Sequence, residues 1–144
     1  MTQKMLTGVF GLAFDGKDRF LLTQRIDHEN EGAHMLWQIP GGGMEFGELP
    51  EETLIRELQE EIKCTPTTLL DRPIVRVSVW PGNNGEDIEY HVTLITYLVS
   101  IGNQVPKTTD ESFDCVWYTL QDLEKIQMLP NVKETVSAFA AVLL

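Results

Sequence analysis

The alternation of apolar and polar residues predicts β-strands along most of the chain. Segments rich in apolar and β-branched residues are separated by polar or glycine-containing turns, which is typical of strands. The predicted strands cover residues 7–14, 19–25, 37–39, 72–80, 88–101 and 113–119. The tetrapeptide Asp15-Gly16-Lys17-Asp18 is a strong turn signal, so the first two strands are expected to form a hairpin.

A helical spacing replaces this alternation after Pro50, a residue that suits the first position of a helix. Apolar residues then recur every three or four positions, at Leu54, Ile55, Leu58 and Ile62. A short helix is expected over residues 120–128, and a final helix from about residue 131 to the end. Strands combined with a few helices predict an α+β fold, with residues 1–144 forming one domain.

Three consecutive glycines precede the helix that begins at Pro50. The sequence Pro40-Gly41-Gly42-Gly43 predicts a loop with unusual backbone freedom. A tight turn alone would explain the run. Its place before an acidic helix suggests a second interpretation, because a backbone without side chains allows a phosphate or a metal ion to approach closely. Gly42 and Gly43 are therefore candidates for substrate binding.

The composition narrows the classes of partner. Hydrophobic residues make up 42% of the chain, enough for a core, and 22 acidic against 11 basic residues give a net charge of −11. Such acidity disfavours binding to long nucleic acids or to anionic membranes. No apolar run approaches the length of a membrane span. Cys64 and Cys115 are expected to be reduced thiols in a cytoplasmic protein, with a disulfide between them as the alternative.

The acidic residues are concentrated around the predicted helix. Residues 42–64 contain seven acidic and two basic residues. On a helix, Glu57, Glu60 and Glu61 fall within about 100° of one another, and like charges at this spacing repel. Glu60 and Glu61 also lie towards the C-terminal end, where the helix dipole disfavours negative charge. One interpretation is a solvated acidic face; the other is an oxygen-rich site for Mg²⁺, Mn²⁺ or Ca²⁺ rather than zinc.

The spacing of these residues resembles that of a known family. The Nudix box reads G-x5-E-x7-R-E-U-x-E-E-x-G-U, where U is apolar, and the chain matches it at Gly42, Glu48, Arg56, Glu57, Leu58, Glu60 and Glu61. Lys63 departs from the box, which has glycine there, and Cys64 is a modest apolar residue. Residues 37–42 resemble the family's entry strand and loop, and Glu111 with Trp117 resembles its closing segment.

The resemblance implies a Nudix-type α/β/α sandwich with a mixed β-sheet, in which the catalytic helix follows the glycine-rich loop. It also implies divalent-metal-dependent hydrolysis of the pyrophosphate linkage of a nucleoside diphosphate derivative, such as a nucleoside triphosphate, ADP-ribose or a nucleotide sugar. Mg²⁺ or Mn²⁺ would be held by Glu57, Glu60, Glu61 and the Gly41 carbonyl. Arg56 would pair with Glu48 and hold the loop against the helix.

The general base stays open between two glutamates. Divalent ions would align a bound water for in-line attack, and a carboxylate would take its proton. The resemblance allows either Glu57 or Glu111 in this role, and Glu111 could equally be a solvated loop residue. Lys63 lies at the C-terminus of the helix, where glycine usually forms a left-handed cap, and is expected to strain that cap.

Residues that contact the substrate are less well defined by the sequence. Arg25, at the end of a predicted strand, is a candidate for phosphate contact, and Phe46 and Trp80 are candidates for stacking on a base. A surface position for the arginine and core or rim packing for the aromatic residues are the alternatives. Specificity is expected to come from loops at residues 27–36, 81–87 and 102–112.

Three functions fit these observations. The first is a pyrophosphohydrolase acting on a small nucleotide derivative, with neither long nucleic acid nor a membrane as partner. The second is a non-catalytic nucleotide-binding domain on the same fold, which would not need every charge of the box. The third is an mRNA-decapping hydrolase, although the sequence shows no basic groove beside the site. The sequence is compatible with a homodimer and does not determine the oligomeric state.

Overall fold

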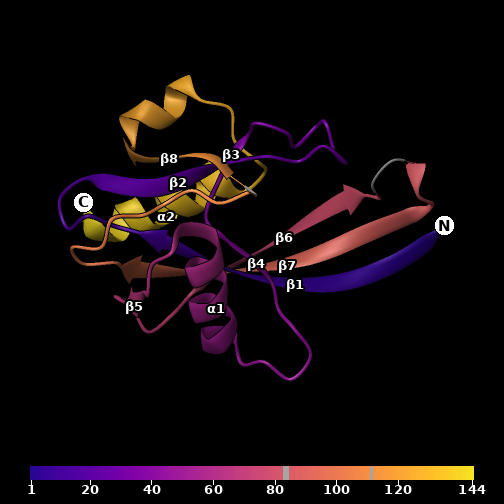
Figure 1. The fold of residues 1–144 in the computed structure, drawn as a ribbon, viewed down its shortest axis with the longest axis horizontal. Coiled ribbons are helices and arrows are strands. Elements are labelled where there is room, and N and C mark those ends of the chain that lie inside the picture. The colour runs from indigo at the N-terminus through magenta and orange to yellow at the C-terminus, as the bar shows by residue number, and fades with distance from the viewer. Residues whose placement is uncertain (83–84, 111) are drawn as a thin grey trace.

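The computed structural model describes residues 1–82, 85–110 and 112–144, and its strands form two β-sheets (Figure 1). The larger sheet contains β1 (Thr2–Ala13), β4 (Gly41–Gly43), β5 (Thr67–Thr68), β6 (Ile74–Pro81) and β7 (Ile88–Ser100). The smaller sheet contains β2 (Arg19–Arg25), β3 (Trp37–Gln38) and β8 (Ser112–Thr119). The helices are α1 (Pro50–Ile62), the 3₁₀ helix η2 (Gln121–Lys125) and α2 (Val132–Leu143).

The larger sheet is mixed. Its order is β4-β1-β7-β5, with β6 also paired to β7; β1 and β7 run parallel, and the other pairs are antiparallel. The smaller sheet is antiparallel, in the order β3-β2-β8. The expected hairpin is wrong, because β1 and β2 belong to different sheets and, within the described residues, one bridge between Phe14 and Phe20 joins them. A turn signal reverses the chain, whereas the partner of each strand depends on the surfaces that pairing buries.

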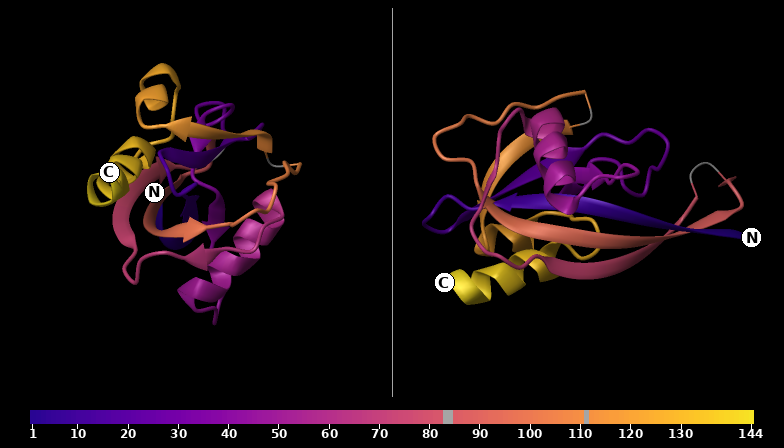
Figure 2. Two further views of the ribbon diagram at one scale, coloured as in Figure 1. Left: turned by 90° about the vertical axis from the view of Figure 1, so that its left-hand side faces the viewer. Right: turned by 90° about the horizontal axis from the view of Figure 1, so that it is seen from below.

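Successive side chains of each central strand contribute to two different cores, because they point to opposite faces of the sheet. Val9 of β1 and Val99 of β7 pack with α1, whereas Leu12 and Leu98 pack with α2. The sheets therefore lie between the two helices, as the left-hand view of Figure 2 also shows. This arrangement confirms the α+β fold and the α/β/α sandwich.

The apolar face of α1 fixes how the helix is oriented on the sheet. Leu54, Leu58 and Ile62 are almost fully buried. Leu49, before the helix, has no polar side chain with which to cap it, and Glu52 accepts a hydrogen bond from the Leu49 backbone N–H at 2.9 Å instead. The rotation of α1 about its axis, and with it the direction of its glutamates, is therefore set by packing.

Three local expectations differ from the structure. The glycine run is not a loop, because Gly41–Gly43 forms strand β4 against β1. The helix expected over residues 120–128 is the shorter 3₁₀ helix η2, which ends at an extended Ile126. Strand β5 has no counterpart among the predicted strands, because two residues are too few to show alternation.

Membrane-spanning helices and disulfides are absent from the described residues. No described helix has the length and apolar character that crossing a bilayer requires. Both cysteines are free, in agreement with the expected reduced thiols. Burial raises the pKa of the Cys64 thiol and raises that of Cys115 to about 12, so both thiols are protonated near neutral pH.

Candidate functional site

Arg56 of α1 lies at the centre of the carboxylate-rich region. Its guanidinium donates to both oxygens of Glu48, with Nε–Oε2 and Nη2–Oε1 distances of 2.8 Å. Nη2 also donates to the Gly43 carbonyl at 2.9 Å. This bidentate pair therefore joins α1 to the loop that precedes it and to the end of β4.

Glu48 accepts further hydrogen bonds from its own surroundings. Its Oε1 atom accepts from the backbone N–H of Glu45 at 2.8 Å and from the Thr53 hydroxyl at 2.9 Å. The hydrogen bonds from Arg56 are the main reason that the pKa of Glu48 falls from 4.5 to about 2. Glu48 is thus ionised at neutral pH, and its charge raises the pKa of Arg56 in turn.

Three glutamates of α1 lie beside this pair. Nη1 of Arg56 is 2.9 Å from Oε1 of Glu57 and 3.5 Å from Oε2 of Glu60. The hydroxyl of Ser112, on β8, donates to Oε2 of Glu61 at 3.3 Å. Glu57 and Glu61 are 8% and 5% exposed, whereas the Glu60 side chain is 59% exposed. Two of the carboxylates are therefore held in place by burial, and the third is accessible to solvent.

The donor set suits a divalent cation but is not preassembled. Carboxylate oxygens are the ligands that Mg²⁺ and Mn²⁺ prefer, and Glu57, Glu60 and Glu61 lie within five consecutive residues of one helix. Among the described residues, no three His, Cys, Asp or Glu side chains already converge as a metal-binding group. The residues fit a metal ion by their chemistry, and ligation by all three would require at least one of these side chains to reorient.

Gly42 lies directly against the carboxylate of Glu57. A Cβ atom at position 42 would be 2.6 Å from Oε2 of Glu57, so a side chain there would displace the carboxylate. Gly41 has a φ angle of 151°, and a Cβ atom there would collide with the backbone of β1 at Val9. These glycines allow β4 to approach both β1 and the carboxylates of α1.

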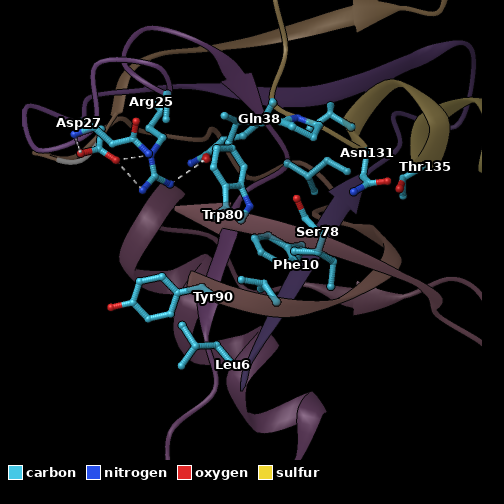
Figure 3. A pocket seen from close by; sticks show the side chains of 18 of the residues that line it. Leu6, Phe10, Arg25, Asp27, Gln38, Ser78, Trp80, Tyr90, Asn131 and Thr135 are labelled. Carbon is cyan, nitrogen blue, oxygen red and sulfur yellow. Dashed lines mark hydrogen bonds and ion pairs between the residues drawn. The ribbon is translucent and has the colours of Figure 1, made fainter. Parts of the chain in front are cut away.

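A cavity of about 610 Å³ lies between the two sheets, near the start of α2 (Figure 3). Its apolar lining includes Leu6, Phe10, Trp80 and Tyr90, and its polar lining includes Gln38, Ser78, Asn131 and Thr135. Its charged lining residues are Lys4, Arg25 and Asp27. This size and this mixture of aromatic and polar groups are typical of a site for a small organic ligand.

The cavity and α1 lie on opposite faces of the larger sheet. Apart from Pro81, every lining residue from β1, β6 and β7 has an even number, as does Leu12, which packs with α2. Odd-numbered residues such as Val9 pack with α1. Strand alternation therefore separates the two regions.

Residues 38–43, which we call the connecting segment, link the two regions. Gln38 and Ile39 line the cavity, and three residues later Gly42 lies against Glu57. The segment ends in β4, at the edge of the larger sheet. A ligand that extends past this edge could contact both regions at once.

Arg25 enters the cavity from the end of β2 (Figure 3). Its Nε and Nη2 atoms lie 2.9 and 2.8 Å from Oδ2 of Asp27, and Nη1 donates to Oε1 of Gln38 at 3.2 Å. Burial opposes the ionisation of Asp27, but hydrogen bonds from Arg25 and from nearby backbone N–H groups outweigh it and lower the pKa of Asp27. Arg25 is thus a positioned cation at a largely apolar cavity.

The structure brings together some of the predicted substrate residues and separates others. Arg25 and Trp80 line the same cavity. Phe46 is fully exposed and is not among the lining residues, so neither stacking in the cavity nor core packing describes it. Glu111 lies outside the described residues.

Two of the expected specificity loops contribute little to the cavity, whereas the loop at residues 27–36 contributes Asp27, Asn30 and Ala33 to its lining. Of residues 81–87 and 102–112, only Pro81 lines it among those that the structure describes. Strand alternation could have indicated Ser78, because it shares a face of β6 with the predicted tryptophan. No sequence pattern indicates Asn131, whose left-handed backbone places its amide against β6, where Oδ1 accepts from Nε of Arg76 at 2.7 Å.

Lys63 ends α1 in the left-handed conformation, with φ 58° and ψ 36°. Its backbone N–H bonds to the Leu58 carbonyl, as in a glycine-terminated helix. A left-handed conformation is strained for a residue with a Cβ atom. The expected strained cap is therefore confirmed, and α1 remains helical as far as Ile62.

Comparison with known proteins agrees with the match of this chain to the Nudix box. A model of the NUDIX domain matches residues 4–139. Nucleoside triphosphatase NudI of Escherichia fergusonii is 32% identical over 130 residues, which cover 76% of this chain and 89% of the relative. An 8-oxo-dGTP diphosphatase of Proteus vulgaris is 40% identical over 73 residues, 49% of this chain and 63% of the relative.

The fold has counterparts among solved structures. The MutT protein of Methanosarcina mazei Go1 superposes with a TM-score of 0.74, covering 99% of this chain and 97% of that one. Its sequence identity is 20%, so this likeness concerns the fold alone.

Proposed function

Because this chain belongs to the NUDIX family and is a hydrolase of pyrophosphate linkages, we propose that its substrate is a nucleoside triphosphate, cleaved to a nucleoside monophosphate and pyrophosphate. The NudI relative, named a nucleoside triphosphatase, supports this choice of substrate. The proposal takes residues 1–144 as one catalytic domain in the cytoplasm, where two free cysteines are common. ADP-ribose and nucleotide sugars are the competing substrates.

One observation carries the proposal: a cavity of nucleoside size and a row of carboxylates lie on the two sides of the connecting segment. The cavity volume of about 610 Å³ falls within the range that small-molecule sites occupy. We propose that the base and sugar occupy this cavity, with Trp80 stacking on the base. The phosphates would then extend past Gly42 and Gly43 towards α1.

Nudix hydrolases generally depend on a divalent cation, and the residues of α1 fit one by their chemistry. We propose that Glu57, Glu60, Glu61 and the Gly41 carbonyl hold Mg²⁺ or Mn²⁺. A bound cation would neutralise phosphate oxygens and lower the pKa of a bound water. Gly42 supports this assignment, because its missing side chain leaves room beside the Glu57 carboxylate.

Two arginines and a catalytic base take the remaining roles in the proposed reaction. Arg56 has four hydrogen bonds to Glu48, Glu57 and Gly43, so it would hold β4 and α1 together instead of binding substrate. Arg25 would neutralise charge on the bound polyphosphate, since Asp27 and Gln38 fix its direction. A carboxylate would accept the proton of the attacking water, with Glu57 and Glu111 as the two proposed bases.

The test is a substrate panel with Mg²⁺, in which chromatography separates and quantifies the nucleotide products and pyrophosphate is detected separately. Chromatography is needed because ADP-ribose, nucleotide sugars and capped RNA are cleaved without releasing pyrophosphate or orthophosphate. Nucleoside triphosphates, 8-oxo-dGTP, ADP-ribose, nucleotide sugars, dinucleoside polyphosphates and capped RNA would be compared. Release of pyrophosphate from a triphosphate at the highest kcat/KM supports the proposal. A higher kcat/KM for ADP-ribose or capped RNA would overturn the choice of substrate, and nucleotide-dependent thermal stabilisation without any turnover would favour a non-catalytic binding domain.

A further inference from the structure

Strand β8 contains an irregularity where it pairs with β2. The regular antiparallel register includes the pairs Thr23–Cys115 and Gln24–Asp114. The next residue of β2, Arg25, then pairs with Ser112 instead of Phe113. Phe113 is therefore an extra residue in β8, as in a β-bulge.

The bulge exchanges the positions of a serine and a phenylalanine. In an unbroken register Phe113 would lie opposite Arg25, on the face of β8 that packs towards α1 through Trp117. Ser112 would lie on the other face of the strand. In the structure Ser112 is 3% exposed and Phe113 is 62% exposed. Hydrophobic burial favours the opposite arrangement, so the buried serine must be compensated by an interaction of its hydroxyl.

That interaction is with Glu61. The Ser112 hydroxyl donates to Oε2 of Glu61 at 3.3 Å, across the space between β8 and α1, and both residues are buried. Arg56 contacts Glu48, Glu57 and Glu60 from within the helix region, whereas Ser112 supplies a donor from a different element. A hydrogen bond of this kind fixes the direction of a carboxylate.

We propose that Ser112 is a positioning residue for the metal site, and that the bulge at Phe113 is present because it turns this hydroxyl onto Glu61. The inference rests on the proposed function, in which Glu61 is a metal ligand. Ser112 would fix the orientation in which Glu61 presents its carboxylate to a divalent cation. It does not itself contact the substrate.

The experiment measures binding of Mn²⁺ alone to the full chain by electron paramagnetic resonance, without any substrate. Ser112→Ala should weaken Mn²⁺ binding by about tenfold, the effect typical of losing a group that orients a metal ligand. Ser112→Thr, which keeps a hydroxyl, should restore binding to near the wild-type affinity. The matched control is Ser100→Ala on β7, because the Ser100 hydroxyl accepts a hydrogen bond from the Gly102 N–H outside this site.

The outcomes separate this inference from the proposed function. Wild-type affinity in Ser112→Ala, with Glu61→Gln still defective, would overturn the role of Ser112 and leave the metal site intact. Mn²⁺ binding that is undetectable in the wild type, or unchanged in Glu61→Gln, would overturn the metal site itself. Equal loss in Ser112→Thr and Ser112→Ala would show that the hydroxyl is not the cause. Thermal melting without metal verifies that each variant is folded.

Discussion

The two sides of the connecting segment differ in what holds their side chains in place. On the α1 side, one cation organises several carboxylates, since Arg56 lies within 4 Å of Glu45, Glu48, Glu57 and Glu60. On the cavity side, Arg25 has one carboxylate partner among the residues that the structure describes, Asp27, and most of the described cavity lining is apolar or neutral. In the first region, ion pairs orient the side chains of a helix that packing has placed, whereas in the second, packing alone shapes most of the lining.

Because of this difference, we expect substitutions in the two regions to have different effects. A substitution among the charges around Arg56 affects several interactions at once, because one guanidinium is shared between several carboxylates. A substitution in the cavity removes one contact with a ligand and leaves the other lining residues in place. We therefore expect changes near α1 to affect turnover and changes in the cavity to affect affinity.

The largest expected effect is on the α1 side. Glu61→Gln removes a carboxylate charge while preserving shape, and should reduce kcat by more than about a hundredfold, since changes that merely disturb a metal's supporting groups already reach that range. The measurement is pyrophosphate release at saturating substrate and Mg²⁺, with circular dichroism to verify the fold. A kcat within a few-fold of the wild type would mean that the carboxylates of α1 do not support catalysis.

On the cavity side, Arg25→Ala should raise KM by about tenfold with little change in kcat, as expected for a group that binds ground state and transition state equally. Steady-state kinetics with a nucleoside triphosphate measures both constants. Arg25→Lys is the matched variant: it keeps the charge but cannot bond Asp27 and Gln38 in the same geometry. If Arg25→Ala lowered kcat instead, the distinction between the two sides would fail.

The coupled charges also predict a pH dependence of stability. The pKa of Glu48 is depressed to about 2 from 4.5, so its ion pair contributes stability above about pH 4.5 and loses that contribution as the pH falls towards 2. Glu48→Gln should therefore be less stable than the wild type at pH 7, and the two should converge near pH 2. Urea unfolding at several pH values measures this, and a difference that did not change with pH would contradict it.

The smallest expected effect concerns the end of α1. Lys63→Gly relieves the left-handed strain and should raise the free energy of unfolding by about 0.5–1 kcal/mol. Lys63→Ala keeps a Cβ atom and should show no such gain. Thermal or urea unfolding compares the three proteins. Activity should not change, because the helix already holds its glutamates in place with lysine at this position.

The site residues of α1 could be predicted from the sequence because they lie close together in the chain. Arg56, Glu57, Glu60 and Glu61 lie on consecutive turns of one helix, so spacing alone places them on one edge. The pairing of Arg56 with Glu48 spans eight residues and follows from the box. Even here, the conformation of the glycine run differed from expectation, since pairing with a distant strand determines whether Gly41–Gly43 is a loop or β4.

The cavity was not predictable in the same way. Its residues come from β1, β2, β3, β6, β7, the loop that follows β2 and the start of α2, and no local sequence pattern indicates that these segments meet. The bulge at Phe113 could not be predicted from the sequence either, because sequence alternation favours burying Phe113 and exposing Ser112. Arg25 and Trp80 could be nominated by residue type, but only the fold shows that they line one cavity.

The parallel pairing of β1 with β7 has a consequence for the order in which the protein forms. Thr2 pairs with Ile88 and Ala13 with Val99, so every pair along these strands is 86 residues apart in the chain. Closing so long a loop loses entropy before any contact is gained, which slows folding. During synthesis, the cavity therefore cannot form until β7 has left the ribosome, because β7 contributes Tyr90, Val92 and Leu94 to its lining.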